Sequence, residues 1–208
     1  MAAPAFENLA KFGVSRESFE RLLIFERLLL TWQAQINLVS DSSLPDLWNR
    51  HIIDSVQLLP LIPKTTVAIA DLGSGGGFPG LILAATQSAE VHFYEANAKK
   101  TAFLNEALRQ MKIGGSVHRL RLESMSEPVG MPDVQLVTAR AFAPLSVLLG
   151  LAEPFMRRGA CALFHKGQEY NTELIQAAKS WKISYDSHPS VTDSQSVILE
   201  IKEIAHVK

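Results

Sequence analysis

The chain has a single cysteine, Cys161, among its 208 residues. One thiol excludes an internal disulfide and a zinc site built on several cysteines. Long apolar runs are also missing, since no stretch reaches the roughly 18 residues that span a membrane. The first residues lack the basic and then apolar pattern of a secretion signal. We therefore expect a cytoplasmic protein with no membrane contact and no bound metal.

An excess of positive charge is absent as well. The chain carries 20 Lys and Arg against 21 Asp and Glu, which gives a net charge of −1. Proteins that coat nucleic acids without selectivity are usually far more basic. A nucleic-acid partner would therefore be recognised by a local patch and by its shape. The length suits one α/β domain with a small extension, which we expect to be a monomer.

A glycine-rich turn is the most informative feature that is present. The apolar run Val67–Ala70 is typical of a buried parallel strand, and it ends in Asp71. Pro79 suits the first turn of a following helix. A strand, a loop and a helix in this order form a nucleotide-type crevice at the carboxyl end of a strand. We expect the ligand to meet the residues between them, Gly73, Gly75, Gly77 and Phe78.

The ligand of this loop is indicated by what the loop lacks. It has no Gly-Lys-Ser/Thr, which a phosphate-binding P-loop needs. A dinucleotide pattern G-x-G-x-x-G would start at Gly73, but its last glycine falls on Phe78. Asp71 at the mouth of the loop would repel a pyrophosphate and would suit a ligand with an ammonium and a sulfonium group. S-adenosylmethionine carries both groups.

A second acidic residue supports the same ligand. Glu95 closes the next apolar run, Val91–Tyr94, roughly twenty positions after Asp71. This spacing fits a carboxylate at the end of the second strand that accepts hydrogen bonds from ribose hydroxyls.

The chain divides into two parts. Residues 1–62 predict a helical extension, with one helix from about Ser15 to Ile36 and another from Leu44 to Leu59. Residues 63–208 alternate between strand and helix patterns, which predicts a doubly wound, mainly parallel sheet of seven strands. The expected strands are 67–71, 91–95, 117–122, 134–139, 160–165, 182–186 and 196–202, and the expected helices are 79–87, 98–112, 144–157 and 170–180.

Several short motifs between residues 37 and 168 resemble the RsmG (GidB) family of bacterial methyltransferases. They are Asn37-Leu38-Val39-Ser40, Arg50-His51-Ile52-Ile53-Asp54-Ser55, the loop Asp71–Gly80, Arg121-Leu122-Glu123, Arg140-Ala141-Phe142-Ala143-Pro144-Leu145 and Lys166-Gly167-Gln168.

The resemblance implies a class I, Rossmann-like methyltransferase fold with an N-terminal helical extension. It implies transfer of a methyl group from S-adenosylmethionine to N7 of one guanine in the 16S ribosomal RNA of the small ribosomal subunit. It also implies that Leu122 and Glu123 contact the adenine side of the cofactor.

The residues agree with this chemistry. Guanine N7 has an in-plane lone pair, so its attack on a methyl group needs no general base. Methylation of an exocyclic amine would favour an Asn/Asp-Pro-Pro-aromatic group where the chain has Thr138-Ala139-Arg140-Ala141-Phe142. Methylation of a cytosine C5 would need a cysteine nucleophile. Cys161 lies inside an apolar run, and we interpret it as a core residue.

Four polar residues are candidates for the reacting site. Arg140, at the end of the fourth strand, could bind the carboxylate of the cofactor or an RNA phosphate, or form an ordinary surface ion pair. Lys166 could donate to guanine O6 or to phosphate, or could be a solvated lysine at the end of a strand. His51 and Asp54 face one side of their helix, where they could orient guanine or the cofactor or form a plain surface network.

Two other function classes stay open at this point. The glycine-rich loop could serve an oxidoreductase that uses a nicotinamide nucleotide. The protein could also be a non-catalytic module that binds a cofactor or the ribosome.

Overall fold

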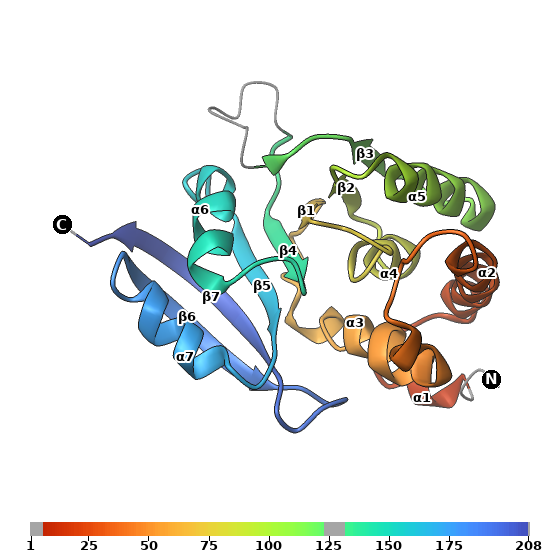
Figure 1. Cartoon of the computed structure of the whole chain (residues 1–208), viewed down its shortest axis with the longest axis horizontal. Helices are drawn as coiled ribbons and strands as arrows, with labels where there is room; N and C mark the ends of the chain where they lie inside the picture. Colours follow the sequence, from red (N-terminus) through yellow and green to blue (C-terminus); the bar gives the residue numbers. More distant parts are fainter. Residues whose placement is uncertain (1–5, 123–131, 208) are drawn as a thin grey trace.

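The protein is built on one twisted sheet of seven strands. A computed structural model describes residues 6–122 and 132–207. The strand order in these residues is β3-β2-β1-β4-β5-β7-β6 (Figure 1). The first five strands run parallel, and β7 pairs antiparallel with both β5 and β6. The prediction of a doubly wound, mainly parallel sheet is confirmed.

The strands follow the apolar runs of the sequence. β1 lies between β2 and β4, and all five of its residues are buried, as expected for the centre of a parallel sheet. β3 ends four residues earlier than predicted. The strands are β1 (Ala68–Leu72), β2 (Glu90–Tyr94), β3 (Ser116–His118), β4 (Leu136–Arg140), β5 (Cys161–Lys166), β6 (Trp181–Pro189) and β7 (Val197–His206).

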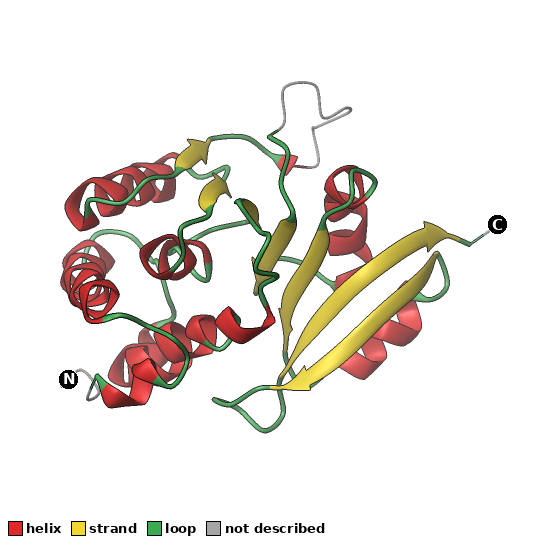
Figure 2. Ribbon diagram, turned by 180° about the vertical axis from the view of Figure 1, so that it is seen from behind, coloured by secondary structure: helices red, strands yellow, loops and turns green. Residues whose placement is uncertain are grey.

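Helices cover both faces of the sheet (Figures 1 and 2). On one face α4 (Gly80–Thr86) and α5 (Ala98–Met111) pack with the helical extension, and on the other α6 (Leu145–Met156) packs with α7 (Tyr170–Ala177). Asn97 begins α5 by accepting hydrogen bonds from two backbone N–H groups. None of the helices in the described ranges combines the length and apolar character needed to cross a membrane.

The N-terminal extension contains one regular long helix. After the short α1 (Glu7–Ala10), α2 (Arg16–Gln33) begins at Ser15, whose hydroxyl accepts a hydrogen bond of 3.1 Å from the Ser18 N–H. This confirms the predicted helix start. The helix ends at Gln33, three residues before the predicted end.

The prediction of a single helix over residues 44–59 is wrong. The chain instead forms a series of short helices of different types. Pro45 and Pro60 each lack the N–H that a regular helix needs, and the Ser55 hydroxyl donates to the His51 carbonyl at 2.7 Å. The segments are the 3-10 helix η1 (Asp41–Asp46), the π-helix η2 (Trp48–Ile53), α3 (Asp54–Val56) and the 3-10 helix η3 (Leu59–Leu61).

The extension and the sheet share one hydrophobic core. The fully buried ring of Phe25 in α2 lies 5.3 Å from the ring of Phe78 and 6.2 Å from that of Phe103 in α5. The indole of Trp48 donates to the buried Glu26 carboxylate at 2.7 Å. Residues on both sides of position 62 build this core, so the core does not mark a domain boundary there. The division of the chain at residue 62 stays a prediction.

Replacing Phe25 tests the shared core. We expect Phe25→Ala to lower the free energy of unfolding by about 3–5 kcal/mol, the usual cost of truncating a buried aromatic side chain. Urea denaturation would measure this loss as a single transition. Leu30→Ala is the matched control on the same helix, because Leu30 is 40% exposed. The contrary result would be two transitions, with that of the sheet unchanged by Phe25→Ala and only that of the extension shifted. The extension and the sheet would then be independent units.

Candidate active site

The glycine loop, residues 73–77, connects β1 to the start of α4. Gly73, Gly75 and Gly77 have positive φ angles of 67°, 54° and 89°, a conformation that glycine adopts without strain. A Cβ on Gly73 would lie 2.3 Å from the ring of Phe142, and one on Gly77 would lie 2.3 Å from the Leu81 side chain. The loop therefore needs glycine both for its turn and for its close packing.

Asp71 lies beneath this loop and not at its mouth, where the sequence placed it. Its side chain is fully buried, and one carboxylate oxygen accepts a hydrogen bond of 2.8 Å from the Thr138 hydroxyl. Burial raises the pKa of Asp71 to about 6, against hydrogen bonds from Ser74, Thr138 and Gly80 that lower it. The residue joins β1 to β4 below the loop, and it does not line the cavity above.

A cavity of about 500 Å³ opens above the glycine loop, and we call it the first cavity. It contains most of the predicted cofactor residues, but Asp71, Gly77 and Leu122 are not among those that line it. Leu122 is buried in a hydrophobic core cluster, and Glu123 lies outside the described residues. The lining consists of Leu38, Val39, Ser40, His51, Gly73, Ser74, Gly75, Gly76, Phe78, Glu95, Lys100, Arg140, Ala141 and Phe142.

The carboxylate of Glu95 is fixed at the edge of the first cavity. One of its oxygens accepts the Gly75 N–H at 2.9 Å, and the other accepts the Asn97 N–H at 2.7 Å. These two bonds set the orientation of the carboxylate and leave lone pairs on both oxygens for a ligand. The end of β2 therefore offers a pre-oriented acceptor.

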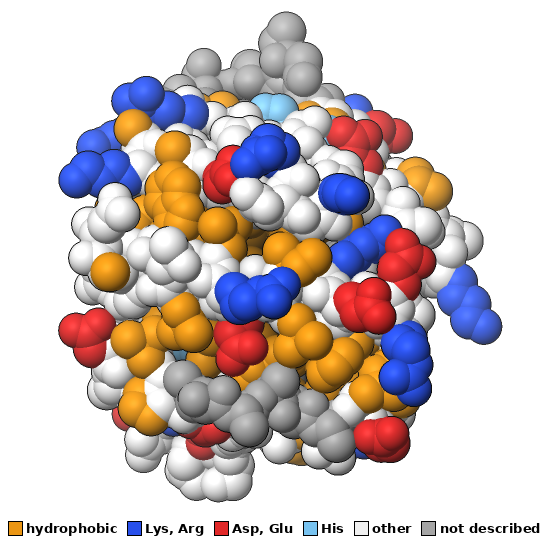
Figure 3. Space-filling model, turned by 90° about the vertical axis from the view of Figure 1, so that its right-hand side faces the viewer, with side chains coloured by type: hydrophobic (Ala, Val, Ile, Leu, Met, Phe, Trp, Pro, Cys, Tyr) orange, Lys and Arg blue, Asp and Glu red, His pale blue; other side chains and the backbone are white. Residues whose placement is uncertain are grey.

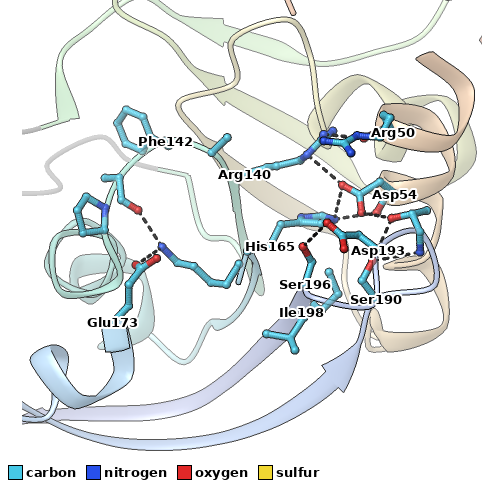
Figure 4. Close-up of a pocket in the computed structure, with 17 residues that line it drawn as sticks. Arg50, Asp54, Arg140, Phe142, His165, Glu173, Ser190, Asp193, Ser196 and Ile198 are labelled. Carbon is cyan, nitrogen blue, oxygen red and sulfur yellow. Dashed lines mark hydrogen bonds and ion pairs between the residues drawn. The ribbon is translucent and has the colours of Figure 1, made fainter. Parts of the chain in front are cut away.

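Arg140 forms the centre of the polar network at the end of β4 (Figure 4). Its Nε lies 3.0 Å from a carboxylate oxygen of Asp54, and its Nη2 donates to the Arg50 carbonyl at 2.7 Å and to His51 Nδ1 at 2.9 Å. Burial lowers the pKa of Arg140. Its Nη1 is buried and has no hydrogen-bond partner in the part of the chain that the structure describes. A buried donor of this kind is available to a ligand.

His51 is neutral in this network. Burial and then the nearby Arg140 charge lower the pKa of His51 to about 4. Since Nδ1 accepts from Arg140, the proton lies on Nε2, which donates to the Ser43 hydroxyl at 2.7 Å. The imidazole also packs on Phe78, with 4.9 Å between ring centres. Phe78 thus lines the cavity and packs on the extension at once.

Asp54 connects the extension to the C-terminal hairpin. Its second carboxylate oxygen accepts hydrogen bonds from the Gln57 amide at 2.7 Å and from the Thr192 hydroxyl at 2.8 Å. Its backbone carbonyl accepts from His165 Nε2 at 2.8 Å. Burial lowers the pKa of His165, so this histidine is neutral too. Both His51 and Asp54 contact Arg140, although the segment that carries them is not the single helix that the sequence predicted.

A second cavity of about 450 Å³ lies between the loop after β4 and the loop that joins β6 to β7 (Figure 4). It adjoins the first cavity, and Arg140, Ala141 and Phe142 line both. Its other lining residues are Arg50, Asp54, Ala143, Pro144, His165, Lys166, Gly167, Glu173, Ser190, Thr192, Asp193, Ser196, Val197 and Ile198.

Lys166 lies in the second cavity, and its ammonium already has two partners. It donates to the Ala143 carbonyl at 2.9 Å and to the Glu173 carboxylate at 2.6 Å. The same Glu173 oxygen accepts the Leu145 N–H at 2.6 Å. Lys166 is therefore not the solvated strand-end lysine that the sequence allowed, and it holds the loop between β4 and α6 in place. Its third N–H remains for a ligand oxygen.

The sequence interpretation missed one wall of the first cavity. Leu38, Val39 and Ser40 form it, and the amide of Gln33 fixes their backbone by accepting the Leu38 and Val39 N–H groups and donating to the Val39 carbonyl. In the sequence these residues stood out only as part of a family motif, which gave them no place in the site. In the described residues, no group of three or more His, Cys, Asp or Glu side chains gathers where it could hold a metal ion.

The histidine titration predicts a pH effect on stability. The folded-state pKa of His51 is about 4, below its usual 6.5, so the unfolded chain binds more protons between these values. His51 therefore stabilises the fold fully above pH 6.5, and this contribution is lost as the pH falls towards 4. Asp71 works in the opposite direction, because its raised pKa makes the folded state bind more protons below about pH 6.

Comparison with His51→Gln isolates the histidine. Glutamine can keep both hydrogen bonds and does not titrate. We expect the stability of the wild type, measured by urea denaturation from pH 7.5 to 4.5, to fall relative to that of His51→Gln. A constant difference across this range would mean that His51 titrates normally.

Proteins of a known family are similar in sequence to this chain over most of its length. A family model described as rRNA small subunit methyltransferase G matches residues 18–201. A protein named ribosomal RNA small subunit methyltransferase G from Paramagnetospirillum magneticum is 45% identical over 96% of this chain and 95% of its own length. A protein of the same name from Bradyrhizobium sp. is 48% identical over 97% of this chain and 91% of its own.

A solved structure shows the same fold at low sequence identity. It is a putative O-methyltransferase from Klebsiella pneumoniae, which is 12% identical, covers 86% of this chain and 90% of its own, and superposes with a TM-score of 0.56. The fold is that of class I methyltransferases. With a family model over most of its length and relatives near 45% identity, the chain belongs to the rRNA small subunit methyltransferase G (GidB) family.

Proposed function

We propose that this protein transfers a methyl group from S-adenosylmethionine to N7 of one guanine in the 16S RNA of the small ribosomal subunit. The observation that carries the proposal is the pair of adjoining cavities, which share Arg140, Ala141 and Phe142 as a common wall. Methyl transfer brings two different ligands into contact, and this arrangement provides a place for each. The names of the relatives support ribosomal RNA of the small subunit as the substrate.

The residues of the first cavity fit the cofactor. The fixed Glu95 carboxylate would accept hydrogen bonds from ribose hydroxyls. The unpartnered Nη1 of Arg140 would donate to the methionine carboxylate. When bound, the cofactor supplies an electrophilic methyl group on a sulfonium centre.

The chain's own residues act by holding the reactants and not by moving a proton. Guanine N7 carries an in-plane lone pair and needs no base. In agreement, His51 is neutral, with one ring nitrogen accepting from Arg140 and the other donating to Ser43. Both Arg140 and His51 are anchored, so the walls need little rearrangement. Orientation and exclusion of water can supply much of the rate enhancement.

Substrate choice depends on shape more than on overall charge. The net charge is −1, and on the face shown in Figure 3 basic side chains are dispersed among acidic and apolar ones. Such a surface binds arbitrary RNA weakly. A folded ribosomal RNA or an RNA–protein surface that presents one accessible guanine fits it better.

The two other function classes are less well supported. Membership in a methyltransferase family argues against an oxidoreductase that uses a nicotinamide nucleotide. Calorimetry with S-adenosylmethionine and with NAD would separate these two. Methyl incorporation into RNA would separate an enzyme from a non-catalytic module that binds a cofactor or the ribosome.

The cofactor site predicts the effect of Glu95 variants. Glu95→Ala should weaken S-adenosylmethionine binding by about 1–3 kcal/mol, because it removes a charged acceptor for ribose hydroxyls. Glu95→Gln keeps one acceptor oxygen and should lose less. Isothermal titration calorimetry measures both, with the exposed Glu203→Ala on β7 as control. Equal affinity of Glu95→Ala and the wild type would show that the ribose binds in another part of the cavity.

The target atom can be tested with an altered base. We expect single-turnover methyl transfer on small-subunit particles and not on particles whose target guanine is replaced by 7-deazaguanine, which lacks the nucleophilic nitrogen. Unrelated RNA should be a poor substrate. Methylation that persists on the 7-deaza particles would eliminate N7 as the target, and equal transfer to unrelated RNA would eliminate structural specificity.

A further inference from the structure

Phe142 has an unusual position in the fold. It follows β4 directly after Ala141, a residue other than glycine whose φ is +49°. Such a conformation is strained for alanine, and strain of this kind concentrates at functional sites. The ring of Phe142 packs on the backbone of Gly73 in the glycine loop. The backbone thus turns unfavourably at Ala141 and carries this aromatic ring into the space between the two cavities.

The loop that carries Phe142 is anchored on its other side by charge. The Ala143 carbonyl accepts from the buried Lys166 ammonium, and the Leu145 N–H donates to Glu173, the ion-pair partner of that lysine. The side chain of Lys166 is only 6% exposed. Breaking this pair would leave a buried charge, which is costly. The ring of Phe142 is therefore presented from a rigid segment.

The shared wall limits where the acceptor base can lie. A methyl group that leaves a ligand in the first cavity must meet its acceptor at Arg140, Ala141 or Phe142, because these residues line both cavities. The second cavity, at about 450 Å³, is within the usual size of sites that enclose small ligands. At its exposed rim lies Arg50, whose guanidinium suits a phosphate.

We propose that the second cavity receives a guanosine nucleotide turned out of the RNA, and that its base stacks on the ring of Phe142. An aromatic face binds a base without occupying its edge. Since the N7 lone pair lies in the plane of the base, stacking leaves that lone pair free to point towards the first cavity. Phe142 is then the residue that positions the base for transfer. This inference rests on the proposed function and adds to it the place of the base.

Variants at Phe142 separate stacking from simple packing. Phe142→Leu keeps an apolar contact with Gly73 and removes the aromatic face, whereas Phe142→Tyr keeps the face. We expect Phe142→Leu and Phe142→Ala to reduce single-turnover methyl transfer on small-subunit particles by roughly 5- to 150-fold, the range for loss of one base stack. Phe142→Tyr should retain the wild-type rate within about threefold. S-adenosylmethionine affinity should change little in Phe142→Leu and Phe142→Tyr, because both keep the packing of residue 142 on Gly73.

Two results of these assays would overturn the inference. One is a Phe142→Leu enzyme as active as the wild type. The other is equal loss of activity in the leucine and tyrosine variants together with loss of cofactor affinity, which would make Phe142 a packing residue only.

Photocrosslinking tests the place of the base without any methyl transfer. We expect p-azidophenylalanine at position 142 to crosslink small-subunit RNA at a single guanine, mapped by reverse transcription, and the same group at the exposed Ile175 on α7 not to do so. A crosslink at one guanine that is never methylated would support the stacking site and contradict the proposed function. Methylation by the wild type with no crosslink from position 142 to the methylated guanine would leave the function intact and overturn the inference.

Discussion

The mostly buried guanidinium of Arg140, whose side chain is 17% exposed, holds the parts of the site together. Arg140 ends β4 in the middle of the sheet, and its partners Asp54, His51 and the Arg50 carbonyl all come from the irregular segment that follows α2. A buried charge must be paired, so removal of either partner is expensive. The helical extension therefore cannot leave the sheet without exposing an unpaired charge. This single requirement places His51 in the wall of the first cavity and Asp54 in that of the second.

The remaining parts of the site depend on backbone groups that polar side chains hold in place. Glu95 fixes the glycine loop through the Gly75 N–H, and Gln33 fixes the opposite wall through the backbone of residues 38 and 39. Lys166 and Glu173 fix the loop after β4. The ligand-facing surfaces are thus set before any ligand binds, which is what catalysis by orientation requires.

Local patterns predicted the sheet, the turn after β1 and the position of Glu95 after β2 well, because each depends on residues close together in the chain. The failures arose from contacts between distant residues. Asp71 could not be placed beneath the loop without its partner Thr138 from β4, 67 positions away. The segment after α2 has an apolar pattern that resembles one helix, but it forms several short helices of different types, and its contacts are with Arg140, about 90 positions away. The ion pair of Lys166 with Glu173 could not be predicted from the sequence either, since both residue types are also common on solvated surfaces.

Arg140 and Asp54 stabilise the fold as one unit. A double-mutant cycle with Asp54→Asn, Arg140→Met and the double variant, followed by urea denaturation, tests it most directly. Each single variant should lose about 3–5 kcal/mol of unfolding free energy, and the double variant should lose much less than the sum, since a buried pair can be replaced more cheaply than it can be broken. Additive losses would show that the two side chains act independently.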